Sequence, residues 1–141
     1  MSVFGERLNE LLVTKGISPE ELAKEMGVTL PTVYEWKAGN QIFYSNLIKL
    51  CNYLNCSIDF IAGRSETELD FKPQVPPPFY VAIREMMAKK NITTYQLRKS
   101  TRFDGSYFAR WKKGAEPYLS TLIELANYFE CTIDELVGRE R

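Results

Sequence analysis

The sequence predicts an all-α protein made of two similar five-helix bundles in tandem, joined by a Pro-rich linker. The first observation is an internal repeat. Trp36 and Trp111 each begin a Trp-Lys-x-Gly string, and a shift of 75 residues aligns 4–64 with 79–139 without a gap. About a third of the aligned positions are identical, and apolar residues recur at helical spacing in both copies. The predicted boundaries are 1–64 for the first domain, 65–78 for the linker and 79–141 for the second domain.

Five short helices account for the apolar pattern of the first repeat. Each helix is expected to turn one apolar stripe toward a shared core, as amphipathic helices of small domains do. In chain order, these stripes are Phe4, Leu8, Leu11 and Leu12; Leu22, Ala23 and Met26; Val33 and Trp36; Leu47, Ile48, Leu50, Cys51 and Leu54; and Ile58 and Ile61. The second repeat keeps Leu97, Phe108, Trp111 and the block after Gly114, so we expect the same bundle there.

Capping residues mark the ends of these helices. Ser18 is expected to cap the second helix, with Glu21 three positions later in a capping box and Pro19 at the first helical position, where its missing N–H costs nothing. Gly27 is placed for a tight turn with positive φ. The other expected helix starts are Thr29, Ser45 and Ser57, and the other expected helix ends are Gly16, Gly39 and Gly63.

The segment 65–78 differs in composition from both repeats. Asp and Glu crowd its first half, and Pro73, Pro76, Pro77 and Pro78 stiffen its second half into polyproline-like geometry. At about 3 Å per residue, an extended segment of this length could reach about 40 Å. We expect a spacer between the domains. The alternative is a Pro-rich ligand for another protein.

The first repeat also carries a signature of several separate residues. Its elements are Leu22-Ala23, Gly27-Val28-Thr29, Val33, Trp36, Gly39 and a tail that reads Leu-Ile-x-Leu and then Cys-Ser-Ile-Asp. These residues resemble the phage-repressor/Cro-type (Xre) helix-turn-helix family, whose domains have the lambda-repressor-like fold. The resemblance covers about nine-tenths of the chain. It implies that the third helix of each domain, the recognition helix, lies in the major groove of DNA with its N-terminal residues facing base edges.

The second repeat departs from this family pattern at the turn before the recognition helix. Ala23, Met26 and Gly27 of the first repeat correspond to Arg98, Thr101 and Arg102. Arg102 at the positive-φ position would cost on the order of 1 kcal/mol, so the turn is where we expect the two repeats to differ. Arg98 is expected to extend past the recognition helix, where Ala109 in place of Tyr34 leaves space.

The outward residues of the first recognition helix are candidates for DNA contact. They are Leu30, Pro31, Tyr34, Glu35 and Lys37. Leu30 and Pro31 could pack on thymine methyl groups, and Glu35 could accept a hydrogen bond from cytosine. The preceding helix carries three glutamates within 20–25, which disfavours contact with a polyanion. The alternative for this domain is therefore a role in packing or dimerisation.

The outward residues of the second recognition helix carry more positive charge. The candidates are Gly105, Ser106, Tyr107, Arg110, Lys112 and Lys113, with Thr94 at the start of the preceding helix. Arg110 can address guanine with two hydrogen bonds, whereas Lys112 and Lys113 can neutralise phosphates. Further donors nearby are Arg98, Lys99 and Arg102. The alternative is a basic helix face that is only solvated.

Composition limits the other functions. Lys plus Arg equals Asp plus Glu at 18 each, but the chain through Lys72 has a net charge of −3 and the rest has +3. There is no histidine, and Cys51, Cys56 and Cys131 form no CxxC pair. Neither a zinc site nor a Cys–His nucleophile is therefore expected. We expect no enzymatic activity and no cofactor.

The remaining conspicuous side chains are expected to support the fold. The three cysteines should lie in the core as small apolar groups. Trp36 and Trp111 should anchor helix packing. Asp59 and Asp134 should lie in the first turn of a helix, where the helix dipole favours them. The residues expected to be partly buried around the fourth helices are Tyr44, Tyr53, Tyr118 and Tyr128.

The leading functional hypothesis is a sequence-specific transcriptional regulator that binds double-stranded DNA. The resemblance implies a repressor of phage or mobile-element type, and a homodimer is an option that the sequence leaves open. The alternative is a protein-interaction adaptor in which one or both modules serve dimerisation or partner binding. No apolar run approaches the ~18 residues of a membrane span, and the amphipathic pattern begins too early for a signal peptide. We therefore expect a cytoplasmic protein.

Overall fold

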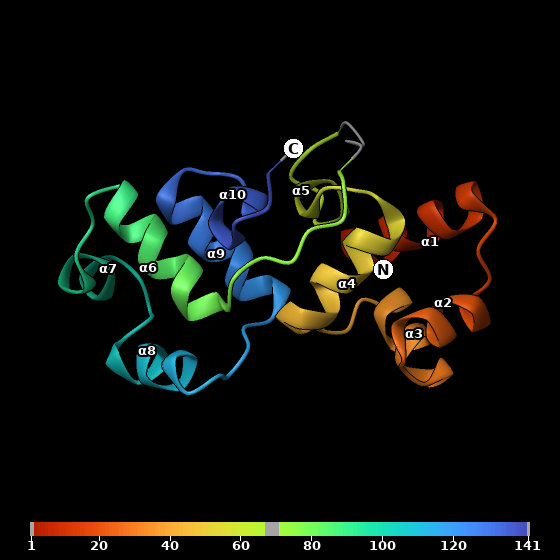
Figure 1. The fold of residues 1–141 in the computed structure, drawn as a ribbon, viewed down its shortest axis with the longest axis horizontal. Coiled ribbons are helices and arrows are strands. Elements are labelled where there is room, and N and C mark those ends of the chain that lie inside the picture. Colours follow the sequence, from red (N-terminus) through yellow and green to blue (C-terminus); the bar gives the residue numbers. More distant parts are fainter. Residues whose placement is uncertain (1, 67–70, 141) are drawn as a thin grey trace. The chain divides into compact units, whose positions relative to one another are not determined.

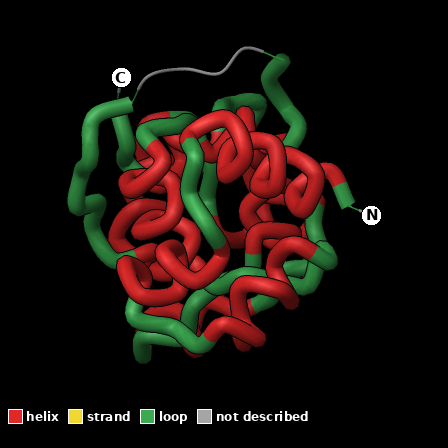
Figure 2. The backbone as a smooth tube through the Cα atoms, turned by 90° about the vertical axis from the view of Figure 1, so that its right-hand side faces the viewer, coloured by secondary structure: helices red, strands yellow, loops and turns green. Residues whose placement is uncertain are grey.

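The structure is a computed structural model that describes residues 2–66 and 71–140, and these residues form ten helices and no strand (Figure 1). The predicted all-α class is therefore confirmed. The chain divides between Pro73 and Gln74 into two compact units of five helices each. Within each unit, short loops connect the helices (Figure 2).

The first unit contains α1 (Val3–Lys15), α2 (Pro19–Met26), α3 (Leu30–Lys37), α4 (Tyr44–Leu54) and α5 (Ile58–Ile61). Every apolar residue predicted to face its core is buried. α3 packs against both α1 and α2. The approach to α1 is so close that a Cβ atom at Gly5 would lie 2.3 Å from the backbone oxygen of Lys37. Only glycine fits at this position, which therefore helps to set the place of α3.

The helix ends of the first unit follow the predicted capping residues, with two departures. The predicted caps whose hydroxyl accepts a first-turn N–H are Ser18, Thr29 and Ser57. The capping box at α2 forms only in part, since the Glu21 carboxylate accepts from the Ser18 hydroxyl at 3.2 Å and not from its backbone. α4 begins at Tyr44, one residue before the predicted start at Ser45, and Phe43 caps it without a side-chain hydrogen bond. The Tyr44 ring at this first position is buried.

The second unit contains α6 (Phe79–Lys89), α7 (Thr94–Ser100), α8 (Gly105–Lys112), α9 (Leu119–Phe129) and α10 (Ile133–Val137). Leu97, Phe108 and Trp111 are buried, as the repeat predicted. Two complete capping boxes begin helices here. They pair Thr93 with Gln96 at α7 and Thr132 with Glu135 at α10.

The turn between α7 and α8 differs from its counterpart in the first unit. α7 ends at Ser100, and Thr101 follows in extended backbone at φ −134° and ψ 173°. The Thr101 hydroxyl donates to the carbonyl of Leu97 at 2.7 Å and accepts the N–H of Phe103 at 3.1 Å. Arg102 is not among the described residues with positive φ. The expectation of a strained arginine was wrong because the Thr101 side chain closes the helix end without a left-handed residue.

Each unit also contains an ion pair that the sequence interpretation missed. Arg64 donates to the carboxylate of Asp59, and Arg139 donates to that of Asp134. The two aspartates do lie in the first turns of α5 and α10, as predicted. Both repeats have Ile-Asp and Gly-Arg at these positions, and this identity could have suggested an ion pair between the aspartate and the arginine.

Two residues of the predicted linker, Phe71 and Gln74, each form hydrogen bonds within one unit. Phe71 is buried in the first unit, where it donates its N–H to the carbonyl of Asn55 at 3.3 Å and accepts from the Asn55 side chain at 3.3 Å. Gln74 accepts the backbone N–H of Glu140 in the second unit at 2.8 Å. The linker thus contributes residues to both units, which divide between Pro73 and Gln74.

Candidate nucleic-acid interface

In the first unit, α2, Gly27 and α3 form a helix-turn-helix. Gly27 ends α2 in the left-handed conformation, at φ 70°. Val33 and Trp36 on α3 are 0% and 3% exposed, and they hold its inner face against the bundle. The Lys49 ammonium on α4 donates to the carbonyl of Met26 at 3.0 Å and so satisfies the end of α2. This packing leaves the opposite face of α3 outward.

In the second unit, α7, the turn at Thr101 and α8 form the equivalent motif. Asp104 caps α8, and its Oδ1 accepts the N–H of Ser106 at 2.9 Å and the Ser106 hydroxyl at 2.5 Å. These hydrogen bonds, with the hydroxyl first, hold the pKa of Asp104 below its ordinary value. The start of α8 therefore carries an exposed carboxylate that stays ionised near neutral pH.

Trp111 lies at the centre of an aromatic cluster that fixes the inner face of α8. Its ring centroid lies 5.1 Å from those of Phe79 and Phe108, 5.7 Å from that of Tyr107 and 5.8 Å from that of Phe103. Edge-to-face and tilted contacts at these distances are favourable. The predicted role of Trp111 as a packing anchor is confirmed, and the rotation of α8 about its axis is set by it.

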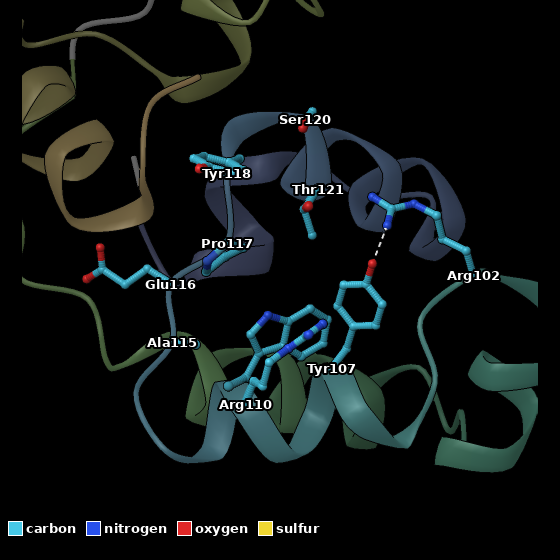
Figure 3. Close-up of a pocket in the computed structure, with 10 residues that line it drawn as sticks. Arg102, Tyr107, Arg110, Ala115, Glu116, Pro117, Tyr118, Ser120 and Thr121 are labelled. Atoms are coloured by element: carbon cyan, nitrogen blue, oxygen red, sulfur yellow. Dashed lines mark hydrogen bonds between the residues drawn. The ribbon is translucent and has the colours of Figure 1, made fainter. Parts of the chain in front are cut away.

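Arg102 connects the turn to both α9 and α8. Its Nε donates to Oε2 of Glu124 at 2.9 Å, and its Nη2 donates to Oε1 at 2.9 Å. Its Nη1 donates to the Tyr107 hydroxyl at 2.7 Å (Figure 3). The hydrogen bonds to Glu124, ahead of the smaller effect of Tyr107, raise the pKa of Arg102 above its ordinary value. The Arg110 guanidinium in turn lies 4.6 Å from the centroid of the Tyr107 ring.

Both units thus present a recognition helix that is anchored by a tryptophan and follows a helix and a turn. The sequence profile of the Cro/C1-type helix-turn-helix DNA-binding domain matches residues 7–62 and again 82–141. The chain belongs to this family. The resemblance drawn from the sequence is confirmed, once in each unit. No match was found among curated proteins or among solved structures.

In the first Cro/C1-type domain, the predicted contact residues differ in exposure. Pro31, Tyr34 and Glu35 are exposed, whereas Leu30 and Lys37 are half-buried. Lys37 is the only basic residue among these five predicted contact residues, and its ammonium lies 5.6 Å from the centroid of the Tyr34 ring. The three glutamates within 20–25 are exposed on α2. Acidic groups therefore outnumber basic groups on this helix-turn-helix.

In the second Cro/C1-type domain, the predicted contact residues form a more basic set. Ser106, Arg110, Lys112 and Lys113 are exposed, whereas Thr94 and Tyr107 are half-buried. Two of these side chains already have partners inside the domain, since the Ser106 hydroxyl donates to Asp104 and the Tyr107 hydroxyl accepts from Arg102. Arg102, expected as a further donor nearby, binds Glu124 in the structure and keeps half of its side chain exposed. Arg98 is exposed, as expected.

Sequence reasoning missed one donor beside the start of α7. Nη1 of Arg84 on α6 donates to the Thr94 hydroxyl at 3.2 Å. The side chain is exposed, so it places a cation next to a predicted contact residue. Its counterpart in the first repeat is Asn9, and comparison of the repeats could have revealed the gain of charge.

An open cleft of about 320 Å³ lies beside α8 (Figure 3). Its lining includes Arg110 and Tyr107 from α8, Glu116 and Tyr118 from the segment before α9, and Ser120 and Thr121 from the first turn of α9. Guanidinium and hydroxyl groups are suitable donors for phosphate oxygens. The cleft therefore places one guanidinium and several hydroxyl groups beside the recognition helix, together with the carboxylate of Glu116.

Over 2–66 and 71–140, no group of three or more cysteine, aspartate or glutamate side chains is placed to hold a metal ion. The three cysteines are buried, as predicted. In the same ranges, no helix is long and apolar enough to cross a membrane.

The tyrosines around α4 and α9 follow the prediction only in part. Tyr53 and Tyr128 are half-buried, as expected. Tyr44 is instead buried at 6% exposure, because it occupies the core position that Leu119 holds in the second unit. Tyr118 is exposed at 40%, because it lies outside the core at the N-cap of α9.

Proposed function

We propose that this protein is a sequence-specific transcriptional regulator that binds double-stranded DNA, a repressor of the phage or mobile-element type. The observation that carries the proposal is the outer face of α8. Arg110 and Lys112 are exposed on this helix and Lys113 is exposed at its C-cap, whereas Trp111 anchors the inner face. The first domain has Glu35, Lys37 and Ala38 at the same positions of the repeat. The second domain is therefore assigned the larger share of DNA affinity.

The proposed roles follow from the chemistry of each side chain. Arg110 offers two parallel donors that match N7 and O6 of guanine in the major groove. Lys112 and Lys113 are assigned to phosphates, which position the domain without reading sequence. Ser106 and Thr94 lie at the starts of α8 and α7, and we assign their hydroxyl groups to the DNA backbone. In the first domain, the weaker contacts are assigned to Leu30, Pro31, Tyr34, Glu35 and Lys37.

The proposal is tested by selecting DNA duplexes from a random pool with the full chain. Enrichment of one motif is the expected result, and its preference at one base pair should depend on Arg110. A pool that emerges without any enriched motif contradicts sequence-specific binding.

A second candidate role applies to the first domain alone. Its exposed glutamates on α2, together with Glu35 on α3, disfavour a polyanion and are compatible with a protein partner or a second copy of the chain. The test is the double substitution Leu30→Ala and Tyr34→Ala in the full chain. Loss of half of the selected motif would assign this domain to DNA, and an unchanged motif would assign it to protein contact.

We propose further that the chain binds as a monomer to an asymmetric site. The two recognition helices present different residues, so two half-sites read by one chain would be unlike. A dimer formed through one domain would instead read a palindrome with identical helices. Covalent linkage raises the effective concentration of the second domain toward the millimolar range, so two weak modules can bind usefully.

A further inference from the structure

The second domain contains a series of side-chain contacts that the first domain lacks. Arg102 and Glu124 occupy the repeat positions of Gly27 and Lys49. In the first domain, Gly27 has no side chain to pair, and Lys49 satisfies a backbone carbonyl of α2. In the second domain, both positions have changed, and their side chains bind each other across 22 residues of sequence.

The contacts around Arg102 restrain its guanidinium, and the side chain is 50% exposed. The two-point contact with Glu124 uses Nε and Nη2, and Nη1 remains for the Tyr107 hydroxyl at 2.7 Å. The guanidinium carbon also lies 4.5 Å from the centroid of the Phe103 ring. A planar group with partners at each of these nitrogens and a ring beside it has little freedom to rotate. Arg102 therefore restricts the position of the Tyr107 hydroxyl.

The Tyr107 ring is held at its other edges as well. Its centroid lies 5.1 Å from that of Phe103 in a T-shaped contact and 5.7 Å from that of Trp111. Arg110 is three residues further along the same helix, and its guanidinium lies 4.6 Å from the centroid of the Tyr107 ring. An exposed arginine that rests on a fixed ring loses less conformational freedom when it binds a base.

We propose that Arg102, together with Glu124, is a positioning residue for base readout: it fixes Tyr107, whose ring orients the Arg110 guanidinium before DNA binds. Arg102 acts through these side chains and does not itself contact a base or a phosphate. The inference rests on the proposed function, because that function assigns base readout to Arg110, the residue that Arg102 is inferred to position.

The first test uses two substitutions in the full chain: Arg102→Gln removes a positive charge, and Glu124→Gln removes a negative charge. The probe is a duplex that the unsubstituted protein selects from a random pool. The base pair to be varied is the one at which Arg110→Ala abolishes the preference, and the probe is also made with each other base pair at this position. Positioning predicts that both substitutions reduce this preference, by about tenfold. A purely electrostatic role predicts opposite effects on affinity and no shared loss of preference. Tyr107→Phe keeps the ring and should give a smaller loss.

The matched controls change the same charges outside the network. Lys89→Gln and Glu85→Gln lie on α6 and are exposed, so they should alter affinity through net charge and leave the base preference intact. Circular dichroism of each variant shows whether the fold is retained. If the preference for the base pair that depends on Arg110 survives in both Arg102→Gln and Glu124→Gln, the inference is overturned. This holds even if the protein selects a motif and the proposed function is supported.

The second test needs no DNA. In the free protein, the side-chain resonances of Arg110 should carry a ring-current shift from Tyr107, and Arg102→Gln and Glu124→Gln should move them toward values of a solvated arginine. Unchanged resonances in these variants overturn the inference by themselves. If the unsubstituted protein selects no motif, the proposed function fails, and this measurement still decides whether Arg102 positions Arg110.

Discussion

In the second unit, Nη1 of Arg139 donates to Oδ1 of Asp134 at 2.7 Å, and the two side chains are 0% and 4% exposed. Removing both charges from water is costly, and the pair offsets that cost only while both partners are present. In the first unit, the arginine of the equivalent pair, Arg64, is 24% exposed. The equivalent Asp–Arg ion pairs of the two repeats therefore differ in burial, and the pair in the second unit is the more deeply buried.

Substitution of Asp134 should strongly destabilise the second unit. Asp134→Ala leaves a buried arginine without its carboxylate, and the expected loss is about 3–5 kcal/mol in the free energy of unfolding. Asp59→Ala should cost less, because water reaches Arg64. Urea denaturation followed by tryptophan fluorescence measures both, since Trp36 and Trp111 report on one unit each. Equal losses in the two units would refute the argument from burial.

The salt dependence of DNA binding should depend on the lysines of α8. Lys112→Ala and Lys113→Ala should each weaken binding to all sequences and reduce the slope of log K against log salt concentration by about one unit. Lys37 occupies the same repeat position as Lys112, so Lys37→Ala is the matched control and should change the slope less. Equal slopes for Lys37→Ala and Lys113→Ala would contradict the dominance of the second domain.

Arg110→Ala should relax the preference at one base pair of the selected motif. A bidentate arginine–guanine contact accounts for about 1–3 kcal/mol of discrimination, and that amount should disappear at this base pair alone. Binding to duplexes substituted one base pair at a time measures it. An equal loss at every position would show that Arg110 contacts only phosphates.

Acid should weaken the second unit through Glu135. Its carboxylate accepts the backbone N–H and then the hydroxyl of Thr132, and these hydrogen bonds hold its pKa below the ordinary 4.5. A carboxyl whose pKa is lower in the folded state stabilises the fold above the unfolded-state pKa. That contribution is lost as the pH falls through the folded-state pKa. Glu135→Gln should therefore reduce the loss of stability below about pH 4.5.

The capping box of α7 provides an internal comparison for this substitution. Gln96 already makes the same contacts there without an ionisable group. Glu135→Gln should consequently change the free energy of unfolding at neutral pH by less than about 1 kcal/mol. Denaturation curves across the acidic range measure both effects, and an unchanged pH profile would show that this carboxylate is not linked to folding.

The mass of the protein on its selected duplex should distinguish the two proposed modes of binding. A monomer on an asymmetric site is expected, because the recognition helices differ at almost every outward position. Sedimentation or light scattering with and without the duplex measures the stoichiometry. A stable dimer on a palindromic site would show that the covalent pair does not share one site.

Local sequence determined most of the helices and both cores. The stripe that includes Val33 and Trp36 follows from apolar spacing, and the caps at Ser18 and Gly27 depend on residues within one helical turn. Such features are settled by neighbours in the chain, so a single sequence is enough to predict them. The repeat added the second domain, because the same spacing recurs 75 residues later.

Tertiary structure alone decided which side chains meet across elements. Glu124 binds Arg102 from a helix that begins well after α8, and no periodic pattern links the two positions. The burial of Arg139 and the docking of Phe71 likewise depend on where neighbouring helices pack. Hydrogen bonds and close ion pairs form only within about 3.5 Å, and packing sets distances of that size between residues far apart in sequence. The candidate contact residues could thus be named from the sequence, whereas the partners that hold Tyr107 and Arg110 could not.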